Sequence, residues 1–121
     1  MMFFRRKPSL LSVAKRLRRR HPIAAMALGR IVLERALRHA CVSRHLPVCK
    51  ISSLQAYTAT ARHHELLERS AFRAIRRVQR VGNRAAHGFM VGSKTAHECL
   101  KDIQEICALL ADDVSRKGGT A

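Results

Sequence analysis

The sequence predicts an all-α protein, an up-and-down four-helix bundle with a short basic helix or arm at its N-terminus. The chain has 121 residues, of which 47% are hydrophobic, but only four Phe, one Tyr and no Trp. The core must therefore be built from Leu, Ile, Val, Ala and Cys, a composition that favours helices. Three Pro and six Gly leave long segments without a helix breaker. The length suits one domain with a single core.

The charge is strongly unbalanced. The chain carries 24 Lys and Arg against 8 Asp and Glu, a formal net charge of +16. Most of these cations are Arg, whose guanidinium group can bind two phosphate oxygens at once. We expect a polyanionic partner, with nucleic acid first, RNA favoured over DNA, and an anionic membrane surface second. The alternative is a basic tail that only keeps the protein soluble.

Residues 1–21 are expected to form a basic N-terminal unit. Four apolar residues stand at helical spacing within it: Leu10, Val13, Ala14 and Leu17. Four arginines between and after them are candidate nucleic-acid ligands: Arg16, Arg18, Arg19 and Arg20. This pattern fits a short amphipathic helix that is ordered only against a partner, and it fits a flexible arm equally well.

Residues 22–114 are expected to form the helical bundle. Pro22 suits the first turn of a helix that we expect to span about residues 24–44. Arg30, Glu34 and Arg38 share the polar face of this helix, at spacings that allow ion pairs. Ile31 also falls on the polar side, which favours a second subunit that covers it.

Three further helices follow in the bundle. A capping box with Ser52 as N-cap predicts a helix that ends near Glu68, and the next helix begins near Ser70. Gly82 is expected to loosen this third helix. Thr95 begins a second capping box, ahead of a last helix with a strong core pattern, and residues 115–121 are expected to form a flexible tail.

The third helix has an apolar stripe and a basic face. The stripe consists of Phe72, Ile75, Val78 and Val81. The basic face, a candidate nucleic-acid interface, consists of Arg73, Arg76, Arg77 and Arg80, with no acid among them. If the helix continues to His87, Arg84 and His87 extend the same face. Contact with a polyanion is favoured over a merely solvated face.

The segment RVGNRAAHG, residues 80–88, carries the candidate chemistry. Arg80 could stabilise charge on a phosphate, and His87 could transfer protons near neutral pH. RNA supplies its own nucleophile, the 2′-hydroxyl, so cleavage would need no metal and no cofactor. Seven residues of helix separate the pair by about 10 Å along the axis. Joint action then requires a bend near Gly82 or two copies that meet. The structural alternative is a helix end at which Asn83 caps locally.

The spacing of Arg80 and His87 resembles the Arg-to-His motif of the HEPN superfamily (higher eukaryotes and prokaryotes nucleotide-binding). The fuller string looks more closely like one HEPN-like bacterial family, catalogued as a domain of unknown function and found alone or fused to restriction-enzyme subunits. The resemblance covers roughly residues 24–112 in helix order and spacing. Its specific core is Gly-Asn-x-Ala-Ala-His; the earlier match at Arg30 and Glu34 is loose.

The resemblance implies a helical bundle, usually a homodimer with the motif at the dimer cleft. It also implies metal-independent endoribonuclease activity in toxin–antitoxin, abortive-infection or phage-defence systems, with an antitoxin or other partner protein. By position, Arg80 and His87 would be the catalytic pair and Asn83 the residue that shapes the turn between them. The alternative is a non-catalytic helical module that binds nucleic acid or a partner protein through the same basic face.

Other classes of site find little support. The cysteines form no CxxC pair, and no set of His and Cys has zinc-like spacing, so we expect free thiols and no metal site. No segment has the length of a membrane span, and no convincing export signal is present. A cytoplasmic protein without an integral membrane segment is the expectation. A protein anchored to a membrane surface by residues 9–20 is the third alternative.

Overall fold

The structure, a computed structural model, describes residues 9–48 and 53–118, with side chains as far as Asp112. Within these ranges all of the regular secondary structure is helical, which confirms the predicted all-α class. The helices are α1 (Leu10–Leu17), α2 (Pro22–Ser43), α3 (Leu54–His63), α4 (Arg69–Ala86) and α5 (Ser93–Gly118).

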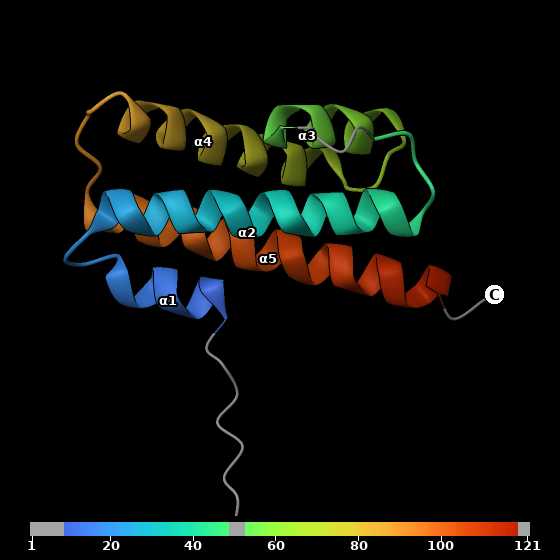
Figure 1. The fold of residues 1–121 in the computed structure, drawn as a ribbon, viewed down its shortest axis with the longest axis horizontal. Coiled ribbons are helices and arrows are strands. Elements are labelled where there is room, and N and C mark those ends of the chain that lie inside the picture. Colours follow the sequence, from blue (N-terminus) through green and yellow to red (C-terminus); the bar gives the residue numbers. More distant parts are fainter. Residues whose placement is uncertain (1–8, 49–52, 119–121) are drawn as a thin grey trace, which may run out of the picture.

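The helix α2 is the centre of the array and contacts each of the other four helices. Figure 1 shows α3 and α4 on one side of α2 and α1 on the opposite side, with α5 alongside α2. The neighbouring helices α2 and α5 run in the same direction, and α4 runs antiparallel to both (Figure 1). The short helix α3 lies beside the first turns of α4, with a groove between the two helices.

One apolar core lies between α2 and its neighbours. The predicted stripes supply it, because their residues recur at helical spacing and so face the same side. The fully buried large side chains include Met26, Leu33, Leu37, Tyr57, Ile75, Val78, Leu100, Ile103 and Leu110. The stripe of α5 and that of α4 are thereby confirmed. Ile31 stands outside this core with 41% of its surface exposed.

The N-terminal segment contains a helix that packs on the chain's own core. The side chain of Ser9 caps α1 by accepting a hydrogen bond from the backbone N–H of Ser12 at 3.1 Å. Ala14 is fully buried, and α1 contacts both α2 and α5. Order in residues 9–17 therefore needs no external partner. At the other end, α5 continues to Gly118, so the boundary expected at residue 114 is not a helix end.

Three helices end in the same hydrogen-bonded motif, with one residue in the left-handed region. This residue is His45 after α2 (φ 57°), Glu65 after α3 (φ 53°) and Gly88 after α4 (φ 83°). In each case the residue that follows the left-handed one donates its backbone N–H to the carbonyl oxygen of the residue five positions earlier. Leu66, for example, donates to the carbonyl of Ala61 at 2.9 Å. This is the Schellman arrangement, which satisfies helix-terminal carbonyls.

Three of the expected helix limits were wrong. The N-cap of α3 is Ser53, whose side chain accepts from Ala56 N–H at 3.2 Å; Ser52 lies outside the described residues. The helix α3 ends at His63 rather than near Glu68, because the chain turns at the left-handed Glu65. The helix α5 begins at Ser93, so Thr95 lies inside its first turn.

Gly82 does not loosen α4, and this expectation was also wrong. It is a buried residue within a continuous helix, where the side chain of Arg30 crosses from α2. A Cβ atom at this position would overlap Arg30 Cδ and stand 3.0 Å from Arg30 Nε. Arg30 Nε is buried and has no hydrogen-bond partner among the described residues. Arg30 is thus a packing residue at the edge of the core rather than part of the polar face of α2.

We expect the Gly82→Ala variant to be less stable than the wild type by about 1 kcal/mol. Overpacking against Arg30 lowers the free energy of unfolding by about 1–3 kcal/mol. The better helix propensity of Ala raises it by only about 1 kcal/mol. In an Arg30→Ala background the clash is absent, and the same change should stabilise the protein by about 1 kcal/mol. Urea unfolding of the four proteins measures this coupling. Equal effects of Gly82→Ala in both backgrounds would contradict the packing argument.

The described cysteines are free thiols, as expected. Cys41 and Cys99 are buried and Cys107 is partly buried. Burial disfavours the thiolate and raises the pKa of all three thiols above the ordinary value. Cys49 lies outside the described residues. None of the described helices combines the length and the apolar run that a membrane span requires.

Candidate nucleic-acid interface

The exposed side of α4 is a stripe of arginine, which we call the α4 stripe. It consists of Arg69, Arg73, Arg76, Arg77, Arg80 and Arg84, and it ends at His87. All seven side chains are exposed. At 100° per residue they fall within an arc of about 100° opposite the buried face, over a length of about 25 Å. The predicted basic face and the three basic residues of the RVGNRAAHG segment, Arg80, Arg84 and His87, therefore form one surface.

Arg77 differs from its neighbours on the stripe. Its Nη2 donates a hydrogen bond to Oδ2 of Asp102 on α5, an ion pair in which the Arg77 side chain keeps 47% of its surface exposed. This hydrogen bond raises the pKa of Arg77 above its ordinary value. Arg77 ties the stripe to the acidic helix α5, so its charge is offset by Asp102, unlike the charges of Arg73, Arg76 and Arg80.

The end of the RVGNRAAHG segment is a Schellman cap. His87 is the C-cap of α4 and Gly88 takes the left-handed position. Gly88 N–H donates to the carbonyl of Ala85 at 3.1 Å, and Phe89 N–H donates to that of Arg84 at 2.9 Å. The guanidinium carbon of Arg84 also stands 5.6 Å from the centre of the exposed Phe89 ring. Helix termination therefore explains Gly88, the last glycine of the segment. The Arg84 side chain is held by its contact with Phe89 in the loop that follows α4.

Arg80 and His87 lie on one continuous helix. No bend at Gly82 brings them together, so about 10 Å of helix axis separates them within one chain. Both side chains are exposed, and neither forms a hydrogen bond or an ion pair within the described part of the chain.

Asn83 does not shape a turn between Arg80 and His87, because the helix runs through it; this expectation was wrong. Its carbonyl accepts the N–H of His87 at 3.1 Å, and its side chain lines a small pocket of about 240 Å³ with Arg30 and Gln79.

The arginines of the N-terminal unit are not part of this surface. Arg16 belongs to α1, which contacts α2 and α5 but not α4. Arg18, Arg19 and Arg20 lie at the turn between α1 and α2, at the end of the array where α4 also ends (Figure 1). The structure thus separates the predicted ligands into the α4 stripe and a second basic region on α1 and the turn after it.

A groove between α3 and α4 was missed by sequence reasoning. Its volume is about 820 Å³, and it is lined by Arg62, Glu65, Leu66, Leu67, Glu68, Arg69, Phe72, Arg73 and Arg76. Arg69 could have been found, since it continues the spacing of Arg73 and Arg76 by one more turn. Arg62 could not, because it comes from another helix. It faces α4 because Thr58, one turn earlier, packs there within hydrogen-bond distance of Gln79 (3.4 Å).

Comparison of the chain with protein-family models, with curated proteins and with solved structures gave no significant match. Within the described residues, no three or more His, Cys, Asp or Glu side chains gather in a way that could hold a metal ion. The α4 stripe and the groove beside it are therefore the candidate functional features of the described residues.

Proposed function

We propose that this protein binds RNA through the α4 stripe. The observation that supports the proposal is the row of exposed arginines on one helix face, on which only Arg77 has an acidic partner among the described residues. Like charges at adjacent turns repel one another and cost stability in the free protein. A polyanion removes that cost, because each arginine that meets a phosphate releases a condensed counterion.

A membrane surface fits less well. The N-terminal helix α1 was the candidate anchor, and its apolar residues pack against α2 and α5 instead of standing free. An interfacial helix needs an apolar face that can be buried in lipid. The α4 stripe has no exposed apolar residue among its arginines, so it offers lipids charge alone, whereas a nucleic-acid backbone offers a row of phosphates along a comparable length.

The first test is the salt dependence of binding to a short single-stranded RNA. If Arg73, Arg76, Arg80 and Arg84 each contact a phosphate, the logarithm of the binding constant should fall with the logarithm of the salt concentration with a slope of about −3. Fluorescence anisotropy of a labelled RNA over a range of KCl concentrations measures it. A slope near zero, or no binding at low salt, would overturn the proposal.

Metal-independent cleavage of RNA is the second candidate function. It is favoured by the exposure of both Arg80 and His87 on the same face with no partner among the described residues. Since about 10 Å of helix separates them, we propose that a homodimer would set Arg80 of one copy near His87 of the other. The HEPN-like motif and a role in a toxin or defence system, in the cytoplasm and with an antitoxin or other partner protein, belong to this proposal.

Cleavage of a labelled RNA in EDTA separates the two functions. The wild type should produce fragments, while His87→Ala and Arg80→Ala should each lose 10²-fold or more of the rate, the usual contribution of a proton-transfer group or an oxyanion donor. If no protein cuts the RNA although all three bind it, the protein is a binding module. Equal cutting by all three would exclude both residues from catalysis.

A further inference from the structure

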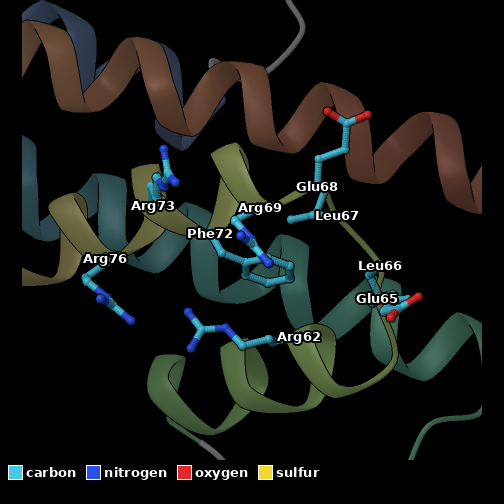
Figure 2. A pocket seen from close by; sticks show the side chains of 9 residues that line it. All are labelled: Arg62, Glu65, Leu66, Leu67, Glu68, Arg69, Phe72, Arg73 and Arg76. Atoms are coloured by element: carbon cyan, nitrogen blue, oxygen red, sulfur yellow. The ribbon is translucent and has the colours of Figure 1, made fainter.

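The groove between α3 and α4 gathers positive charge around one aromatic ring. Figure 2 shows the side chains of Arg62 and Arg69 at the Phe72 ring, from two different helices, while Arg76, further along α4, points toward the Arg62 guanidinium group. The guanidinium carbon of Arg62 stands 5.4 Å from the centre of the Phe72 ring. That ring is only 6% exposed and is part of the core, so it forms a rigid floor. The cation–π contact holds Arg62 in place before any ligand arrives.

None of these three guanidinium groups forms an ion pair with an acid in the described part of the chain. Glu65 and Glu68 line the same groove, but Figure 2 shows their carboxylates pointing away from the three guanidinium groups. Neither glutamate forms an ion pair with a described arginine.

The position on α4 adds to the imbalance. Arg69 is the first residue of the helix, the first turn holds no acid, and Glu68 makes no side-chain cap. Cations at a helix N-terminus are unfavourable because the macrodipole is positive there. An anion in the groove would relieve both effects.

The acids define where a bound strand would end. The α4 stripe leads from His87 to Arg69, and beyond Arg69 the chain presents Glu68 and Glu65. A polyanion laid along the stripe meets negative charge past the groove, so its last phosphate lies within the groove. A terminal phosphate carries about −1.5 to −2 charges and three acceptor oxygens, whereas each backbone phosphate carries one charge. The guanidinium groups of Arg62, Arg69 and Arg76, which line one groove, match the terminal phosphate better.

We propose that this groove binds the terminal phosphate of an RNA strand through Arg62, Arg69 and Arg76. The inference rests on the proposed RNA binding by the α4 stripe and adds to it a site that selects strand ends. The distance from Arg76 to His87 is about 16 Å along the helix, the length of about five stacked nucleotides. If the terminal phosphate of a strand is bound in the groove, the nucleotides that follow it would therefore contact the stripe at fixed positions counted from that end.

The test compares three forms of one short single-stranded RNA, with a 5′-phosphate, a 3′-phosphate or hydroxyl groups at both ends. Filter binding of the internally labelled RNA to the full chain gives the three affinities. We expect one phosphorylated form to bind about tenfold more tightly than the hydroxyl form, because the terminal phosphate adds charge and acceptor oxygens for charge-assisted hydrogen bonds to the guanidinium groups. The variant Arg62→Gln/Arg69→Gln should lose this ratio, and the matched variant Arg35→Gln/Arg38→Gln, on the exposed side of α2, should retain it.

The outcomes separate this inference from the proposed function. Equal binding of all three RNAs by the wild type would overturn the terminal-phosphate site and leave RNA binding by the stripe intact. Absence of any binding would overturn both. A phosphate preference that survives in Arg62→Gln/Arg69→Gln would place the site outside the groove. Adenosine 5′-monophosphate serves as the second source of the same group; if it binds as tightly as the phosphorylated RNA, the site takes mononucleotides and not strand ends.

Discussion

Replacement of Ile103 by alanine is expected to lower the free energy of unfolding by about 2–5 kcal/mol. Ile103 is fully buried on α5 and faces α2 at Gly29. A Cβ atom at Gly29 would stand 2.9 Å from Ile103 Cδ1, so the isoleucine methyl group lies directly against the α2 backbone. Truncation would leave a cavity that this close backbone approach cannot fill by side-chain rearrangement, which places the loss well inside the range for buried aliphatic residues.

Urea unfolding followed by circular dichroism measures this loss as a lower midpoint with an unchanged slope. The control is Leu109→Ala on the same helix, where the side chain is 52% exposed. This change removes a comparable aliphatic group and should alter the free energy of unfolding by no more than about 0.5 kcal/mol. Similar losses in both variants would show that α5 does not pack on α2 as described.

The fold class could be predicted from the sequence because the apolar residues of α4 and α5 recur at helical spacing without interruption. Ile75 and Val78, or Ile103 and Leu110, can face one core only if their segments are helical. Pro22 likewise marks the start of α2. These patterns involve residues only a few positions apart, so they can be recognised without knowledge of the tertiary contacts.

The helix limits could not be predicted as well, because they depend on contacts that the sequence does not display. The chain leaves α3 through Glu65, whose backbone is in the left-handed region. A glycine at this position would have indicated the helix end in the sequence, but a glutamate does not. Conversely, Gly82 resembles a helix breaker but stands inside α4, because Arg30 of α2 occupies the space of a side chain. In both cases the tertiary arrangement overrides the local preference of the residue.

The candidate site was predicted in part. The arginines of α4 and His87 share one face because they belong to one helix, which spacing alone can show. The cation–π contact between Arg62 and Phe72 joins residues of two helices, and no pattern along the chain indicates it. The pairing of Arg77 with Asp102 is hidden for the same reason, since the partner lies 25 residues further along the chain.

Neutralising four of the unpaired arginines of the α4 stripe is expected to reduce the affinity for RNA by about two to three orders of magnitude at 0.1 M salt. The variant carries four changes: Arg73→Gln, Arg76→Gln, Arg80→Gln and Arg84→Gln. Each phosphate contact contributes about 0.7 to the slope of log affinity against log salt, or about fivefold at 0.1 M. The magnitude of this negative slope should therefore decrease by about 3. Glutamine keeps the length and the helix propensity of the side chain, so the fold should persist.

A matched pair of variants separates position from net charge. Arg80→Gln/Arg84→Gln and Arg35→Gln/Arg38→Gln each remove two charges from exposed helix faces, the first from the stripe and the second from α2. If RNA lies along the stripe, the first variant loses about twentyfold in affinity and the second less than about threefold, because only the first loses phosphate contacts. Equal losses would mean that RNA responds to the overall charge of +16 and that the stripe has no special role. The comparison is decisive because the net charge of the two variants is identical, so only the location of the removed guanidinium groups differs.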